Sequence, residues 1–147
     1  MREYRLAVAT ALAALALAVI GGLIDPGSAP LACPDWPLCQ GEALPALAGQ
    51  VLVEHGHRIA ALVVAALTVG VAALVMKNRD DPALRGLAVA AVTLVGAQAV
   101  LGAIAVVWAL PVVARLGHLV TAMLFFAVVV HLALRLRPPA PATASRP

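Results

Sequence analysis

The chain has 147 residues, of which 63% are apolar and 12% are charged, and its mean hydropathy is +1.01. Soluble domains of this size carry far more polar surface. The net charge of +3 is too small to indicate a nucleic-acid partner, so we expect none. The composition instead predicts a protein that resides in the lipid bilayer.

Four apolar runs are long enough to cross a hydrocarbon core as helices, which takes about 20 residues each. They lie at about residues 6–24, 51–76, 84–108 and 112–136. We therefore expect an all-α membrane protein, with one four-helix transmembrane domain at residues 1–137 arranged up-down-up-down. The Pro/Ala-rich residues 138–147 are predicted to form a disordered cytoplasmic tail.

Basic residues are distributed unevenly between the two ends of these runs. Only Arg58 and Arg115 lie at the ends next to the loop at residues 25–50. The others lie at the opposite ends: Arg2, Arg5, Lys77, Arg79, Arg85, Arg135, Arg137 and Arg146. The positive-inside rule predicts a multi-pass protein of the cell membrane with both termini in the cytoplasm. The loop at residues 25–50 and the turn at Pro111 are then extracytoplasmic.

The first run begins after the basic segment Met1–Arg5, as a secretory signal does. Its apolar part is longer than a typical signal core, so we expect a retained helix. The outer loop that follows contains both cysteines, in Cys33-Pro34-Asp35-Trp36-Pro37-Leu38-Cys39. Disulfides persist outside the cytoplasm, which favours a Cys33–Cys39 disulfide over free thiols. Its role, structural or redox-active, stays open, and two cysteines alone do not make a zinc site.

The second run contains a polar cluster near its outer end, Glu54-His55-Gly56-His57-Arg58. Glu54 lies one helical turn before His57 on the same face, where it could act as a general base, bind a substrate or orient His57. A solvated carboxylate at a helix start is the alternative. His55 lies on the opposite face from His57 and is the weaker ligand candidate.

Polar residues in the third and fourth runs are few. Gln98 is predicted to form a hydrogen bond between helices, or else to line a pocket. Arg115 lies three residues before His118, and we expect Arg58 and Arg115 either to pair with anions such as haem propionates or to extend to headgroups. His131 lies thirteen residues after His118, which turns it away from that site towards the inner boundary.

His57 and His118 occur at matching depths. Each lies about six residues into a run that starts outside, which corresponds to about 9 Å of helix. The second and fourth helices of such a bundle occupy a diagonal of roughly 14 Å, because neighbouring axes are about 8–10 Å apart. Two imidazoles could then bind a haem iron between them. The alternative is two helix-end histidines that face headgroups.

These residues together resemble the haem A synthase family. The similarity rests on Gly21-Gly22, Leu31–Gly41 with its two cysteines, Glu54-x-x-His57-Arg58, Gln98-x-x-Leu101-Gly102 and His118-Leu119. The resemblance implies oxidation of a haem O methyl group to the formyl group of haem A through successive hydroxylations. It also implies a haem b cofactor, a catalytic Glu54, and His57 and His118 as axial ligands of haem iron.

The chain departs from the family pattern in two respects. Members usually carry two four-helix halves, whereas this sequence contains one, so we expect either a homo-oligomer or a single site that serves both haems. Asp25 stands near the place where the family tends to have an arginine after the Gly-Gly pair. Haem O synthase and an outer thiol or quinone redox partner are the further partners that the resemblance implies.

Two other classes of function remain open from the sequence. A membrane haem-binding or haem-carrier subunit would bind haem between the histidines without turnover. A thiol–quinone oxidoreductase would use the cysteines of the outer loop, although that class usually needs a second cysteine pair to pass electrons on.

Overall fold

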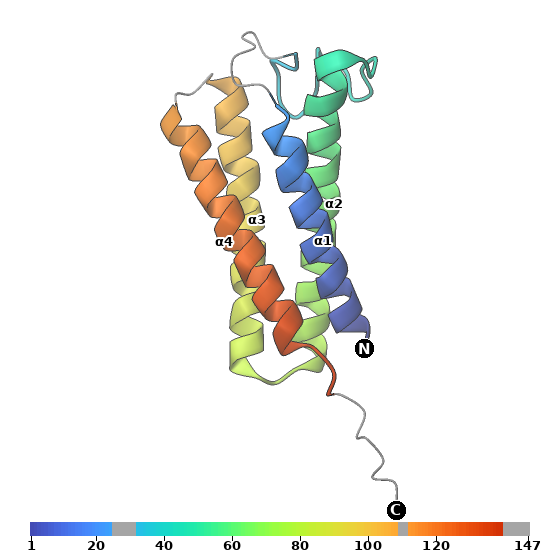
Figure 1. Ribbon diagram of the computed structural model, residues 1–147, viewed down its shortest axis with the longest axis vertical. Helices are drawn as coiled ribbons and strands as arrows, with labels where there is room; N and C mark the ends of the chain where they lie inside the picture. Colours follow the sequence, from blue (N-terminus) through green and yellow to red (C-terminus); the bar gives the residue numbers. More distant parts are fainter. Residues whose placement is uncertain (25–31, 109–111, 140–147) are drawn as a thin grey trace, which may run out of the picture.

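The computed structural model describes residues 1–24, 32–108 and 112–139, with the side chain of Val112 excepted. Four helices account for most of these residues: α1 (Arg2–Gly22), α2 (Gly49–Asn78), α3 (Pro82–Val107) and α4 (Val112–Arg135) (Figure 1). Each helix is long and apolar enough to cross a membrane, and the described residues contain no strand. The predicted all-α, four-helix membrane fold is confirmed. Asp25, Pro111 and residues 140–147 of the predicted tail lie outside the described residues.

The four helices form a closed ring of neighbours. Helices α1 and α3 each pack against both α2 and α4. Among the described residues, α2 does not contact α4 and α1 does not contact α3. Helices α2 and α4 therefore occupy a diagonal of the bundle, as the order of the spans predicts.

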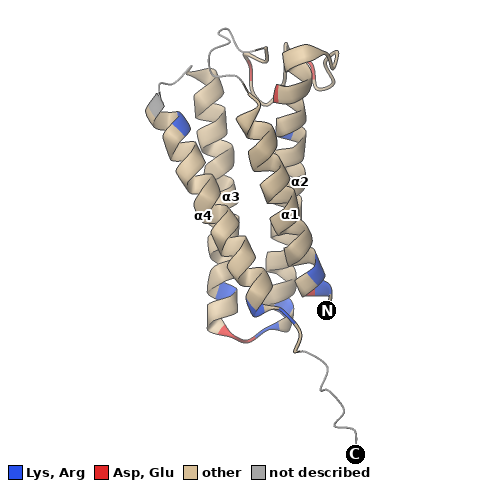
Figure 2. Cartoon of the chain, in the orientation of Figure 1, with Lys and Arg blue, Asp and Glu red and all other residues tan. Residues whose placement is uncertain are grey.

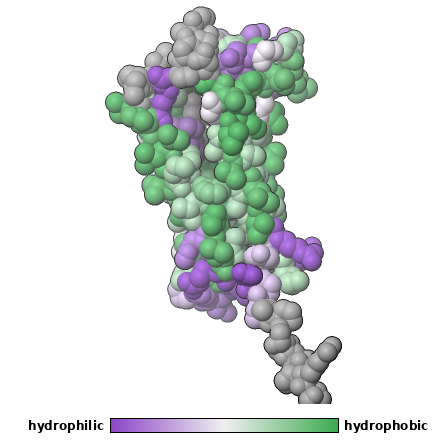
Figure 3. Space-filling model, in the orientation of Figure 1, coloured by the Kyte–Doolittle hydropathy of each residue, from purple (hydrophilic) through white to green (hydrophobic). Residues whose placement is uncertain are grey.

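The bundle has two chemically different ends. At the charged end, α1 starts, α2 connects to α3 and α4 finishes, and most of the lysines and arginines gather there (Figure 2). At the loop end, Arg58 and Arg115 are the two basic residues. Between the ends, the face of the molecule seen in Figure 3 is largely apolar. The predicted separation of basic residues is present, and the assignment of the charged end to the cytoplasm stays a prediction from the positive-inside rule.

Paired charges close the charged end. The Glu3 carboxylate is buried and accepts hydrogen bonds from Arg79 Nε at 2.8 Å and Asn78 Nδ2 at 3.0 Å. These contacts join the first turn of α1 to the end of α2, and α1 accordingly begins at Arg2. Asp81 caps α3 by accepting the N–H of Ala83 at 2.8 Å, and it also binds Arg135 of α4 at 3.1 Å.

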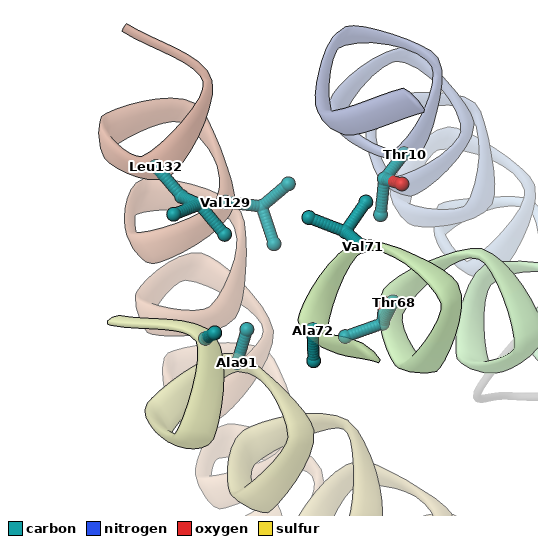
Figure 4. Close-up of a pocket in the computed structure, with 8 residues that line it drawn as sticks. Thr10, Thr68, Val71, Ala72, Ala91, Val129 and Leu132 are labelled. Carbon is teal, nitrogen blue, oxygen red and sulfur yellow. The ribbon is translucent and has the colours of Figure 1, made fainter. Parts of the chain in front are cut away.

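The fully buried apolar residues lie in the half of the bundle towards the charged end. They form two clusters built from Ala7, Ala14, Val64, Val71, Val75, Leu84, Ala88, Ala91, Phe125, Val129, Leu132, Ala133 and Leu136. The alanines let the helix backbones approach closely, as in other membrane bundles. A cavity of about 10 Å³ remains between them (Figure 4), which is room for about one water. The space between these clusters is therefore too small for a large ligand, and the larger hollow of this half, about 190 Å³, is an open apolar groove between α1 and α4.

Packing differs in the half towards the loop end. Beyond Ala91 in α3, and before Phe125 in α4, none of the described residues is fully buried. In the first fifteen residues of α2, only Glu54 and His55 are buried, and both are polar. The loop-end half thus contains polar side chains where the other half contains a packed apolar core.

The tight packing of the charged half is testable at Ala88, which is 0% exposed. We expect Ala88→Leu to lower stability by about 1–3 kcal/mol, because the added methylene groups must displace neighbours in a close-packed core. The measurement is thermal unfolding of the purified protein in detergent. Val89→Leu is the matched control, since Val89 is 56% exposed on the same helix. Equal melting temperatures for both variants would contradict the described packing.

Candidate functional site

A short loop closed by a disulfide covers the start of α2. Cys33 and Cys39 form the disulfide, with their Cα atoms 4.5 Å apart, and both residues are fully buried. Cys39 also exchanges two backbone hydrogen bonds with Glu42, at 3.0 and 3.1 Å. These contacts give residues 32–42, which we call the disulfide loop, a defined shape.

Asp35 organises the disulfide loop from within. Its carboxylate accepts the N–H of Gln40 at 2.7 Å and that of Gly41 at 2.8 Å. Both residues have positive φ, 57° and 81°, a conformation that glycine adopts easily and that suits a tight turn. The N–H of Gly41 has the larger effect and that of Gln40 the smaller one. Both lower the pKa of Asp35, because they stabilise its ionised form.

Two charged residues of α2 hold the disulfide loop by its backbone. Glu54 is buried beneath the loop. Its carboxylate accepts hydrogen bonds from the N–H of Ala32 at 3.0 Å and from that of Cys33 at 2.9 Å. The Arg58 guanidinium donates to the carbonyl oxygens of Cys33 at 2.8 Å, Asp35 at 2.6 Å and Leu38. Residues four apart lie on one face of a helix, so one face of α2 binds both kinds of backbone group. We call Glu54 and Arg58 the loop clamp.

His57 lies between the two residues of the loop clamp in sequence but points to α1. Its ring packs so closely on Gly21 that a Cβ there would lie 3.0 Å from Cε1. The imidazole also lies next to the backbone of Leu17, one turn earlier in α1. Within the described part of the chain, the Nδ1 atom of His57 is buried and has no hydrogen-bond partner.

His118 occupies the equivalent place between α3 and α4. Its ring packs against Gly102, where a Cβ would lie 3.6 Å from Cε1. Gln98, one turn before Gly102, donates from Nε2 to the backbone carbonyl of His118 at 2.9 Å, which is the predicted hydrogen bond between helices. Like that of His57, the Nδ1 atom of His118 is buried and lacks a partner among the described residues.

The two imidazoles lie on the two helices of the diagonal, His57 on α2 and His118 on α4. A buried nitrogen without a partner costs about 1–3 kcal/mol, which a metal or hydrogen-bonding ligand would recover. Imidazole nitrogen is a common axial ligand of haem iron, so these residues fit a haem held between the helices.

The other predicted site residues are placed as follows. Arg115 is exposed on α4, one turn from His118 towards the loop end. His55 is 5% exposed, and neither ring nitrogen has a partner within the described ranges. His131 is exposed far from the loop end, as the sequence predicts. Arg58 donates to the disulfide loop and Glu54 accepts from it. The contact of Arg58 with propionates stays a prediction.

Some of these features were not anticipated from the sequence. The packing of Gly21 and Gly102 against the two histidines was not expected, although both glycines belong to the motifs quoted above. A sequence signal for this packing existed, because the same combination occurs twice. Each of the helix pairs α1–α2 and α3–α4 has one such glycine on its first helix and one histidine on its second. The role of Asp35 had a weaker signal, an aspartate five residues before Gln40-Gly41 in a loop.

Fold and site together define a multi-pass membrane protein whose four-helix bundle presents a pair of histidines across its diagonal, beneath a disulfide loop. The model of the cytochrome oxidase assembly protein family COX15-CtaA matches residues 45–130, more than half of the chain. The chain belongs to this family, which confirms the resemblance to haem A synthases and places its function in cytochrome oxidase assembly. The matched segment contains the loop clamp and both histidines but begins after the disulfide loop. No curated protein sequence matches the chain.

The lowered pKa of Asp35 predicts how the disulfide loop responds to acid. Because the folded-state pKa lies below the ordinary value of about 3.9, the Asp35 contacts contribute fully above that value and are lost as the pH falls through the folded-state pKa. We expect the amide hydrogens of Gln40 and Gly41 to stay protected from exchange near pH 5 and to lose protection only below pH about 3.9. Asp35→Asn should abolish this pH dependence, whereas the control Glu42→Gln should retain it. A wild-type protection that declines already between pH 6 and 5 would contradict the assignment.

Proposed function

We propose that this protein is a haem A synthase-type oxidoreductase that converts a methyl group of haem O to a formyl group. The observation that carries the proposal is the pair of buried, unpartnered Nδ1 atoms of His57 and His118 on the two diagonal helices. Membership of the cytochrome oxidase assembly family supports it, since haem A is a prosthetic group of such oxidases. When bound, haem b supplies the electron-transfer chemistry of the reaction.

Each residue of the site has a role in this proposal. His57 and His118 hold the haem iron from facing helices, and the backbones of Gly21 and Gly102 fix the planes of the two imidazoles. Arg58 holds the disulfide loop through three carbonyls. We assign the propionates to Arg115 because this cationic residue lies one turn from His118 towards the loop end.

Glu54 is the proposed proton acceptor. It lies one turn, or about 4.5 Å, from His57 along α2. Each of its oxygens accepts one N–H from the loop, and a carboxylate has about four acceptor positions, so acceptor capacity remains for water or substrate.

A single four-helix unit offers one histidine pair, so we propose that two or more protomers together supply the sites for haem O and haem b. Small residues on the helix surfaces favour such association in lipid. The proposal further includes a haem O synthase that delivers the substrate and an outer thiol or quinone redox partner, whose oxidised form, a disulfide or a quinone, accepts the electrons. The disulfide loop is then extracytoplasmic.

Pigment analysis tests the proposed reaction. The chain is expressed together with a haem O synthase, and haems extracted from the purified protein are separated by chromatography. We expect haem A and a hydroxylated intermediate. Glu54→Gln should retain bound haem but lower turnover by roughly 10²–10⁴-fold, because it removes a general base. Haem with no conversion in the wild type would establish a haem-binding subunit, and colourless protein would contradict both functions.

The glycine next to His57 provides a direct test of haem ligation. Gly21→Ala would place a methyl group 3.0 Å from His57 Cε1, closer than ordinary van der Waals contact, so the imidazole must move. We expect a large loss of bound haem or a changed absorption spectrum after reduction. Gly22→Ala is the matched control, because a Cβ on Gly22 meets nothing within 4 Å. Equal haem content and identical spectra in the two variants would show that His57 is not a ligand.

A further inference from the structure

We propose that Arg58 is a positioning residue that holds the disulfide loop in its closed shape and thereby makes the Cys33–Cys39 disulfide harder to reduce. The inference concerns the loop and α2, and it requires no haem. It therefore stands or falls independently of the proposed function.

The contacts of Arg58 are distributed around the ring that the disulfide closes. The guanidinium donates to three backbone carbonyls. They belong to Cys33 itself, to Asp35 in the loop, and to Leu38, directly before Cys39. A guanidinium is planar and rigid, with five N–H donors in fixed directions. It can bind these three carbonyls together only when the two cysteine segments are as close as the disulfide brings them.

Glu54 completes this arrangement from the other side of the same peptide segment. Glu54 accepts a hydrogen bond from the N–H of Cys33, and Arg58 donates one to the carbonyl of the same residue. Both backbone groups of one half-cystine are thus bound by charged side chains of α2. Hydrogen bonds with a charged partner are about twice as strong as neutral ones, so the loop clamp contributes strongly to the shape of the loop.

Thermodynamic linkage connects this clamp to the redox state of the disulfide. Reduction adds two electrons and two protons, breaks the S–S bond and leaves two thiols, which allow the loop many more conformations. Any group that binds the closed loop better than the open loop stabilises the disulfide by the difference. Loss of one charge-assisted contact corresponds to roughly tenfold in the equilibrium constant, or about 30 mV for this two-electron couple.

The experiment is a redox titration of the full chain in detergent. Wild type, Arg58→Ala and Arg58→Lys are equilibrated in buffers of reduced and oxidised dithiothreitol, quenched with acid and labelled with a thiol-reactive polymer. Each dithiothreitol that reduces the loop gives up two electrons and two protons and becomes a cyclic disulfide. The chain has two cysteines, so a gel shift reports the dithiol fraction directly.

We expect Arg58→Ala to shift the equilibrium at least about tenfold towards the dithiol. Arg58→Lys should fall between wild type and Arg58→Ala, because an ammonium group cannot reach all three carbonyls at once. The matched control is Arg79→Ala, which removes an arginine bound to buried Glu3 at the charged end. It should lower thermal stability yet leave the redox equilibrium within twofold of wild type.

Two results would overturn the proposal. One is a folded Arg58→Ala protein with the wild-type redox equilibrium. The other is an equal shift in Arg79→Ala, which would assign the effect to general destabilisation. If Arg58→Ala does not fold, Arg58→Lys and Glu54→Gln decide the question: a shift towards the dithiol supports the role of the clamp, and wild-type equilibria in both contradict it.

Discussion

Two oppositely charged residues one turn apart on α2, Glu54 and Arg58, determine the structure at the loop end of this protein. An ionised carboxylate and a guanidinium at the edge of an apolar bundle are costly unless their hydrogen-bonding capacity is used. Glu54 and Arg58 use it on the backbone of the disulfide loop, which supplies two N–H groups to one and three carbonyl groups to the other. The large apolar side chains of the loop, Trp36 and Leu38, are exposed, so the loop depends on these hydrogen bonds to the helix as the helix charges depend on the loop.

The contrast between the two halves of the bundle follows from the same constraint. Towards the charged end, alanines and β-branched residues fill the interior, and the hydroxyls of Thr10 and Thr68 donate to carbonyls of their own helices at 2.8 and 2.7 Å. This half supplies the rigidity of the fold. The loop-end half is then free to contain histidines with unpartnered nitrogens, which is an arrangement that a ligand would stabilise.

Much of this architecture could be predicted from the sequence, because it depends on residue type and spacing. Apolar runs predicted the four helices, and their order predicted that α2 and α4, which carry His57 and His118, lie on a diagonal. The partners of Glu54 and Arg58 could not be predicted, since they are main-chain groups that every loop sequence carries. The four-residue spacing puts Arg58 and Glu54 on one helix face, but nothing in the sequence shows that the loop folds back onto that face. The packing of His57 on Gly21 depended likewise on the rotation of α1 against α2.

The two helix pairs are similar in plan but opposite in charge. In each pair, a glycine of the first helix packs against a histidine of the second, and a charged residue precedes that histidine by three positions. The charged residue is Glu54 in α2 and Arg115 in α4. Equivalent positions of the two helix pairs therefore carry opposite charges, and the two pairs are not interchangeable at the loop end. The carboxylate of the first pair is used on the loop backbone, which ties the α1–α2 side of the bundle to the disulfide loop.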